Sequence, residues 1–208
     1  MTEVTPDYRY TDAGPTWANA YLWPVLRREV ESLVLPPPQR AFDLGCGSGA
    51  TAGMLSGLGF DVTGVDPSES GIALAKAAYP SCRFEVASAY DDLAALFGRF
   101  PLVVSFEVVE HVYDPRRYAR TFNDLVEPGG TAIISTPYHG YLKNLALALT
   151  GKLDDHFTAL WDGGHVKFFS VSTLGQLLAE AGFKDIRFIR VGRIPPLAKA
   201  MVAVTRKA

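Results

Sequence analysis

The segment from Asp43 to Gly49 (DLGCGSG) places three glycines within five residues, directly after an apolar run and an acid. Glycine lets the backbone adopt unusual conformations and lets a ligand approach it closely. Where such a turn joins a strand to a helix, its outward-pointing amides suit a nucleotide-like ligand. The third glycine lies one residue earlier than the dinucleotide pattern GxGxxG requires, and Asp43 would repel a pyrophosphate. The indication for a pyrophosphate is therefore weak.

A second acid has a spacing that suits the same ligand. Asp66 ends the next apolar segment, DVTGVD, at the distance along the chain at which a carboxylate meets a ribose diol in nucleotide-binding folds. A tight turn or a capped helix could explain each feature separately. Because Asp43, the three glycines and Asp66 occur in register, we expect a nucleoside-containing ligand.

The four histidines are the candidates for proton transfer. A neutral imidazole can remove the proton of an oxygen nucleophile near pH 7. His111 follows an apolar segment expected to be a central strand, so it is the first candidate, with His139 and His165 next. His139, His156 and His165 all lie between residues 137 and 169, among several aromatic residues.

The motif EVVEH, residues 107–111, also allows a metal site. Glu107, Glu110 and His111 are spaced at i, i+3 and i+4, which would place them on one face of a helical turn. Two carboxylates and an imidazole suit a hard-to-borderline divalent cation. We treat this site as an alternative and assign no metal ligand.

The elements that must position these residues alternate along the chain. A helix is expected over residues 17–35, before three prolines, and another over 50–58. Three more are expected at 68–78, 91–97 and 115–126. Strands are expected at 40–44, 61–66, 83–87, 101–106 and 131–135. After residue 136 this alternation breaks, and it resumes with a helix at 172–181 and strands at 186–191 and 199–205. The pattern predicts an α/β fold, a Rossmann-like, doubly wound and mostly parallel seven-stranded sheet with helices on both faces.

We expect one domain over residues 1–208. It would comprise an N-terminal helical cap (1–38), a ligand-binding core (39–136), a substrate-side insert (137–169) and a C-terminal part of the sheet (170–208). Residues 141–153 are apolar enough for a lid helix. Five apolar residues could line an acceptor cavity or pack the insert onto the sheet: Phe157, Leu160, Trp161, Phe168 and Phe169.

Composition limits the partners and the compartment. The chain has 208 residues, 48% of them hydrophobic, a net charge of −2 and two cysteines outside any CxxC pair. This charge argues against nucleic acid as a partner. The cysteines indicate reduced thiols, and neither a signal peptide nor a membrane-spanning segment is recognisable. We expect a cytoplasmic protein, a monomer or a homodimer, that acts on a small molecule.

The motifs FDLGCGSG, VTGVDPS, VVSFEVVEHV and EPGG together resemble the class I S-adenosylmethionine-dependent methyltransferases. Within that class, the chain is similar to the ubiquinone-biosynthesis O-methyltransferases. The resemblance covers residues 40–136 well and the last two strands by pattern. It implies methyl transfer from S-adenosylmethionine, with S-adenosylhomocysteine as product, most simply to an oxygen of a flat or lipophilic molecule.

The resemblance also assigns the cofactor contacts. Asp43 would lie near the methionine ammonium, Asp66 would accept from both ribose hydroxyls, and Pro67 would pack on the adenine. Many relatives carry Asp at the position of Ser88, so a backbone contact to the adenine amine is the alternative there. The full set of expected cofactor-binding residues is Asp43, Gly45, Cys46, Gly47, Asp66, Pro67, Ser88, Ala89, Phe106 and Glu107.

Two other functions stay open on sequence alone. An NAD(P)-dependent oxidoreductase would need the third glycine one residue later and would leave EVVEH without a role. A non-catalytic protein of the methyltransferase fold could keep every cofactor-binding residue. For the metal, the resemblance supports both interpretations, because E-x-x-E-H is thought to hold a divalent ion in the ubiquinone O-methyltransferases, whereas metal-free relatives often carry an acid and a histidine here.

Overall fold

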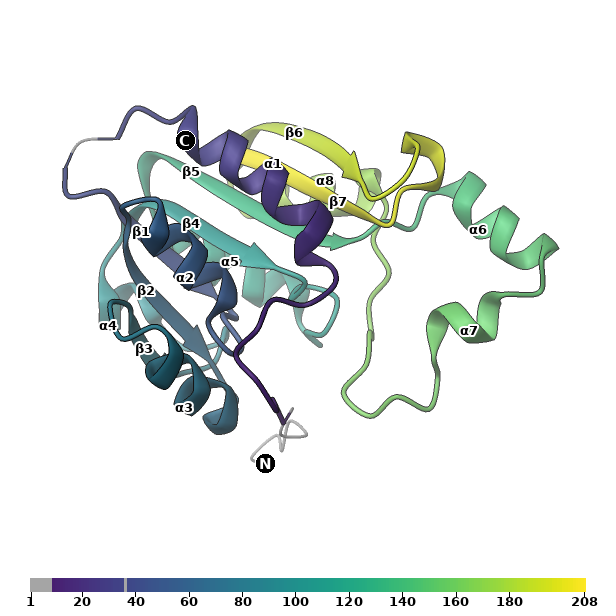
Figure 1. Cartoon of the computed structure of the whole chain (residues 1–208). Coiled ribbons are helices and arrows are strands. Elements are labelled where there is room, and N and C mark those ends of the chain that lie inside the picture. Colours follow the sequence, from purple (N-terminus) through teal and green to yellow (C-terminus); the bar gives the residue numbers. More distant parts are fainter. Residues whose placement is uncertain (1–8, 36) are drawn as a thin grey trace.

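The computed structural model of the chain describes residues 9–35 and 37–208, and its centre is one seven-stranded sheet (Figure 1). The strand order is β3-β2-β1-β4-β5-β7-β6. Strands β1 to β5 pair in parallel, and β7 is antiparallel to both of its neighbours. This confirms the predicted mostly parallel sheet. The strands are β1 (Arg40–Leu44), β2 (Asp61–Asp66), β3 (Arg83–Val86), β4 (Phe100–Phe106), β5 (Val126–Pro137), β6 (Phe183–Val191) and β7 (Ala200–Lys207).

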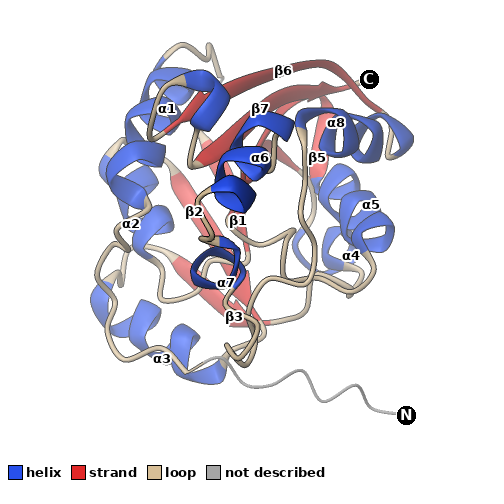
Figure 2. Cartoon of the chain, turned by 90° about the vertical axis from the view of Figure 1, so that its right-hand side faces the viewer, coloured by secondary structure: helices blue, strands red, loops and turns tan. Residues whose placement is uncertain are grey.

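Helices cover both faces of the sheet (Figure 2). On one face, α1, α2 and α3 enclose a core that includes Leu26 and Leu55, and on the other, α4, α5 and α8 enclose a core that includes Phe122 and Leu178. Helices α6 and α7 lie apart from these layers, beyond the ends of the strands (Figure 1). The helices are α1 (Asn19–Glu31), α2 (Ala50–Gly57), α3 (Glu69–Ala78), α4 (Leu93–Phe97), α5 (Pro115–Leu125), α6 (Tyr141–Leu149), α7 (Leu153–Phe157) and α8 (Val171–Glu180), with a short 3-10 helix η1 (Pro195–Leu197).

Local sequence explains why several of these elements begin where they do. The side chains of Ser68, Asp114 and Ser170 accept hydrogen bonds from the first-turn amides of α3, α5 and α8. Such caps satisfy donors that have no partner within the helix. Strand β4 is apolar except for Ser105, whose hydroxyl donates to the Leu44 carbonyl. Its residues 102–105 are buried because the strand lies at the centre of the sheet under helices on both faces.

The segment between β5 and α8 differs most from its prediction. The lid helix expected over 141–153 is two helices, α6 and α7, separated by Thr150, Gly151 and Lys152. Gly151 has a φ of +67°, a conformation that ends a helix. Strand β5 is also longer than expected, because residues 127–130 bulge out of its pairing with β4 and the strand continues to Pro137.

The topology determines where a ligand can bind. The connections run in opposite directions from β1 and β4, which are neighbours, and open α/β sheets bind ligands beyond the carboxyl ends of the strands at such a point. Helices α6 and α7 stand over this edge of the sheet (Figure 2). Within the part of the chain that the structure describes, no helix is long and apolar enough to cross a membrane.

Candidate functional site

A cavity of about 1950 Å³ opens beyond the carboxyl ends of β1, β2 and β4. This is larger than the roughly 300–1,000 Å³ of a typical small-molecule site, so it has room for two ligands. Every cofactor-binding and catalytic residue expected from the sequence lines it. These are Asp43, Gly45, Cys46, Gly47, Asp66, Pro67, Ser88, Ala89, Phe106, Glu107, His111, His139 and His165. The structure thus brings the predicted residues together, while their individual roles stay predictions.

The glycine turn has the backbone conformation that only glycine adopts easily. Gly45, Gly47 and Gly49 have φ values of +77°, +53° and +86°. A Cβ on Gly45 would lie 2.5 Å from the Val108 side chain, and one on Gly49 would lie 2.8 Å from Ala75. These two glycines therefore allow the turn to pack against its own protein, and Gly45 and Gly47 both line the cavity.

Two buried carboxylates stand behind the turn. Asp66 accepts hydrogen bonds from the amides of Gly47 and Ser68, each at 2.9 Å, and so ties β2 to the turn. Asp43 is 1% exposed, and its Oδ2 has no partner among the described residues. Burial, with the charge of Asp66 second, raises the pKa of Asp43 to about 7. A ligand ammonium at this place would supply the missing partner, so the residues fit the methionine part of S-adenosylmethionine.

The N-terminal segment also contributes to this end of the cavity, which the sequence did not reveal. A Cβ on Gly47 would lie 2.6 Å from the hydroxyl of Tyr10, so the Tyr10 ring covers the turn. The Tyr79 hydroxyl donates to the Ala13 carbonyl and holds this segment against α3. The sequence shows only that aromatic residues precede α1 and lie within it. Whether one of their rings covers the turn depends on how the N-terminal segment packs.

The loop after β3 lies at the far wall of the cofactor end. The Ser88 amide donates to Asp91 Oδ2 at 2.7 Å, and the Tyr90 amide donates to Ser88 Oγ at 3.2 Å. The side chain of Ser88 is thus used in shaping its own loop. This arrangement favours the backbone, rather than the Ser88 side chain, as the contact for an adenine amine.

The expectation that Glu107, Glu110 and His111 share one face of a helical turn is wrong. Glu107 has a φ of +56°, and residues 107–112 form a turn rather than a helix. Glu107 accepts from Ser135 Oγ at 2.8 Å, whereas Glu110 accepts from Thr136 Oγ1 at 2.9 Å. Burial raises the pKa of both carboxyls. Glu107 lines the cavity, and of the two acids only Glu110 belongs to the group with His111 described next.

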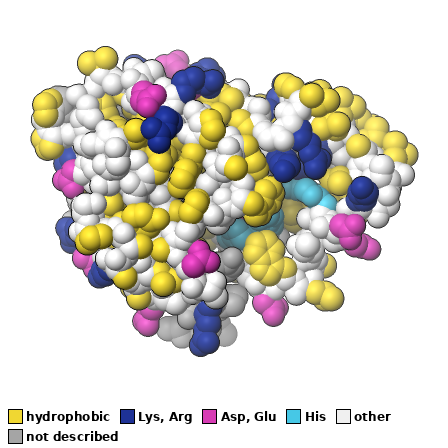
Figure 3. Space-filling view, in the orientation of Figure 1, with side chains coloured by type: hydrophobic (Ala, Val, Ile, Leu, Met, Phe, Trp, Pro, Cys, Tyr) yellow, Lys and Arg dark blue, Asp and Glu magenta, His cyan; other side chains and the backbone are white. Residues whose placement is uncertain are grey.

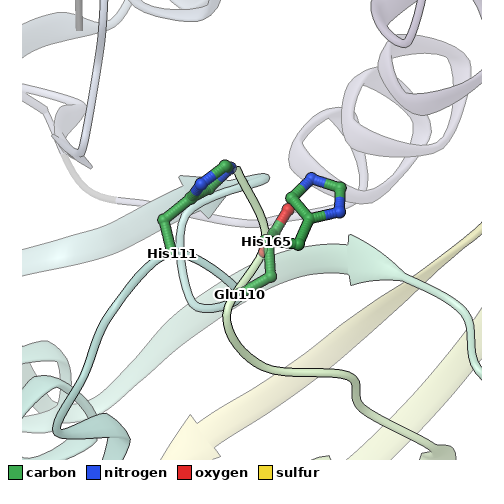
Figure 4. A group of neighbouring side chains, drawn as sticks. All are labelled: Glu110, His111 and His165. Carbon is green, nitrogen blue, oxygen red and sulfur yellow. The ribbon is translucent and has the colours of Figure 1, made fainter. Parts of the chain in front are cut away.

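A different trio gathers around Glu110 (Figure 4). Glu110, His111 and His165 each place a potential ligand atom within 4.8 Å of the others, and Oε1 of Glu110 has no hydrogen-bond partner among the described residues. His165 lies beside Glu110 because the amides of Val166 and Lys167 donate to the Glu110 carbonyl at 2.8 and 2.9 Å. One carboxylate and two imidazoles suit a borderline divalent cation. The sequence pattern named two of these three residues and did not pair them with His165.

His111 has the geometry of a general base. Its Nδ1 lies 3.0 Å from the Gly163 carbonyl and 3.3 Å from that of Gly164. Since a carbonyl oxygen only accepts, Nδ1 carries the proton and Nε2 is left as an acceptor. Burial lowers the pKa of His111, which keeps the ring neutral near pH 7.

His139 is in a more enclosed place. It is 8% exposed, stacks on Phe157 with ring centroids 5.7 Å apart, and meets the edge of Phe168. Burial, with the Lys143 charge second, lowers the pKa of His139 to about 4. The pKa of His165 is also lowered to about 4, mainly by burial. Both rings are consequently weak bases.

Fewer of the large apolar residues at positions 157–169 line the cavity than the sequence suggested. Of the five residues named from the sequence, Trp161 lines it. Phe157 and Phe168 pack around His139, Leu160 is 97% exposed, and Phe169 joins the core under α8. The interpretation that the segment packs onto the protein therefore applies to most of it.

Comparison with known proteins also indicates a methyltransferase. A model of the methyltransferase domain family matches residues 19–187. The ubiquinone biosynthesis O-methyltransferase of Thiobacillus denitrificans is 31% identical over 168 residues, which are 77% of this chain and 71% of that protein. The enzyme of the same name from a Caulobacter species is 41% identical over 116 residues, 54% of this chain and 46% of that protein. The chain thus spans about half the length of this second relative.

Solved structures agree on the fold. An S-adenosylmethionine-dependent methyltransferase from Mesorhizobium loti matches with a TM-score of 0.66 and 22% identity, covering 89% of this chain and 97% of that one. Magnesium protoporphyrin IX methyltransferase from Synechocystis, solved with bound S-adenosylhomocysteine, matches with a TM-score of 0.65 and 17% identity, covering 90% and 80%. Because the family model matches most of its length, the chain belongs to the methyltransferase domain family.

Proposed function

We propose that this protein transfers a methyl group from S-adenosylmethionine to an oxygen of a small, flat or lipophilic molecule, with His111 as the general base. The observation that carries the proposal is the single cavity that joins the glycine turn and its buried acids to the acceptor nitrogen of His111. The names of the curated relatives support oxygen as the methylated atom.

S-adenosylmethionine, when bound, supplies a methyl group that its sulfonium already activates. The protein therefore has to align an acceptor with that methyl and to exclude water, which is mainly an entropic contribution. Asp66 would accept from the ribose hydroxyls, and the glycine turn would face the methionine part, with Asp43 near its ammonium. Nε2 of His111 would take the hydroxyl proton as the carbon–sulfur bond breaks and the carbon–oxygen bond forms.

The test is the transfer of isotope from methyl-labelled S-adenosylmethionine to a panel of phenols, catechols and quinols. Labelled methyl ethers in the products would support the proposal. An intact fold that binds S-adenosylhomocysteine but labels no acceptor would favour a non-catalytic protein. Tryptophan quenching by NADH, without quenching by S-adenosylhomocysteine, would favour an oxidoreductase.

A further inference from the structure

The acceptor end of the cavity is lined by cations that the proposed chemistry does not use. They come from separate segments: Lys143 on α6, Lys152 just before α7, and Arg193 and Lys199 in the connection from β6 to β7. In the space-filling view, Lys and Arg side chains gather beside histidine at the hollow between the sheet and α6 (Figure 3). This end of the cavity therefore carries positive charge.

Lys143 is the most telling of these cations because it is buried. Lys143 is only 7% exposed. Its Nζ donates to the Tyr138 carbonyl at 2.7 Å and to the Lys199 carbonyl at 3.4 Å. Both acceptors are neutral. None of the ion pairs among the described residues includes Lys143. A buried charge without a counter-ion is costly, and a bound anion would remove that cost.

Arg193 adds a second charge at the same place. It forms no hydrogen bond or ion pair with the residues that the structure describes. It lies close enough to Lys143 for its charge to lower the pKa of that side chain. Burial and the charge of Arg193 together lower the pKa of Lys143 to about 8, and the opposing effect of Glu107 is the smallest of the three. Asp155, at the rim, is the other acid at this end of the cavity.

Apolar groups lie beside the cations. Ala146 and Leu147 of α6, Leu197 of η1 and the ring of Trp161 line the same end. A flat ring can rest on such a surface while an anionic substituent reaches Lys143 and Arg193. Arginine and lysine both bind carboxylates, and arginine can do so with two parallel hydrogen bonds.

We propose that the methyl acceptor is an aromatic hydroxy acid whose carboxylate binds between Lys143 and Arg193. This assignment deepens the proposed function and rests on it for the acceptor hydroxyl. The carboxylate site orients the ring, so that one hydroxyl points toward His111 and the cofactor end.

Calorimetry on the protein saturated with S-adenosylhomocysteine tests the site directly, with 3,4-dihydroxybenzoate and its neutral methyl ester as probes. The acid is expected to bind about 10- to 100-fold more tightly than the ester, the effect of charge-assisted hydrogen bonds. Lys143→Met and Arg193→Gln should each remove most of this difference. Lys184→Met, at an exposed position on β6 outside the cavity, is the matched control and should preserve it.

Other results would overturn the inference. Equal binding of acid and ester, or no binding of the acid, would exclude a carboxylate site. If Arg193→Gln, an exposed change that should not affect folding, weakened S-adenosylhomocysteine itself by the same factor, the cations would belong to the carboxylate of the cofactor. The proposed function is judged separately by label transfer: transfer to neutral acceptors only, insensitive to both variants, would keep that function and reject the acid as acceptor.

Discussion

The two ends of the cavity differ in charge and in how the chain builds them. The cofactor end is acidic, and its key residues, Asp43 to Asp66, lie within one strand–turn–helix–strand unit. The acceptor end is basic and is assembled from residues as distant in sequence as Lys143 and Arg193. A cofactor site made by one continuous unit can be recognised from a short motif, whereas an acceptor site made from separate segments changes with every insert.

Burial acts in opposite directions at the two ends. It raises the pKa of Asp43 to about 7 and lowers the pKa of Lys143 to about 8. Each end thus holds a buried ionisable group that forms no ion pair with the described residues. A zwitterionic cofactor with an ammonium suits the first end, and an anionic acceptor suits the second.

The largest expected effect comes from filling the cofactor end. Gly47→Val should abolish measurable binding of S-adenosylhomocysteine, because its side chain would occupy the space under Tyr10 and would need a φ of +53°, which β-branched residues disfavour. Calorimetry measures the binding and circular dichroism the fold. Gly57→Val is the control, since a Cβ there meets nothing within 4 Å. Normal binding by Gly47→Val would mean that the turn is not the cofactor site.

At the boundary between the two ends, His111→Ala should lower kcat by about 10²–10⁴-fold and leave cofactor affinity near normal. The wild-type rate should rise with pH as the ring loses its proton, with a midpoint below 6.5 because burial lowers the pKa of His111. A pH–rate profile with each acceptor measures this. An active His111→Ala variant would move the base to another group.

The divalent-ion interpretation of Glu110, His111 and His165 makes a separate prediction. If an ion is needed, EDTA should abolish wild-type activity, and Mg²⁺ or Mn²⁺ should restore it. His165→Ala should then raise the concentration of metal required for half-maximal rate, because it removes one of three ligands. Full activity in EDTA would contradict the metal site and leave His111 as a general base that acts without a metal.

A smaller effect is expected for Asp66, the proposed partner of the ribose hydroxyls. Asp66→Ala should weaken S-adenosylhomocysteine by about 1–3 kcal/mol, the cost of losing charge-assisted hydrogen bonds. Part of this loss would come from a disturbed glycine turn, since Asp66 also accepts hydrogen bonds from the Gly47 and Ser68 amides. Asp66→Asn, which keeps an acceptor, separates the two contributions by calorimetry. Wild-type affinity in both variants would reject the assigned site.

The smallest effect concerns stability. The pKa of Asp43 is raised in the folded protein from 3.8 to about 7, so its contribution to stability is present at low pH and is lost as the pH rises through about 7. Without cofactor, Asp43→Asn should therefore raise Tm at pH 8 by about 2–4 °C or more, the effect of 1 kcal/mol in a chain of this size. At pH 5 the gain should be smaller. A lower Tm at pH 8 would show that the carboxylate has a partner in the empty site.

The sequence by itself determined the cofactor half of this protein. Apolar strands, capping residues and glycines at fixed spacing act over a few residues, so the order of the elements, the glycine turn and Asp66 could be predicted. The acid–histidine motif was also recognisable as a candidate site, because it follows the central strand.

Only the tertiary structure decided the acceptor half. His165 lies beside Glu110 because the amides of residues 166 and 167 donate to the Glu110 carbonyl, and no spacing rule relates positions so far apart. The Tyr10 ring reaches Gly47 through the path of the N-terminal segment. Lys143 and Arg193 line one cavity because α6 and the β6–β7 connection stand at the same edge of the sheet. Such contacts follow from packing between distant segments, which local patterns do not encode.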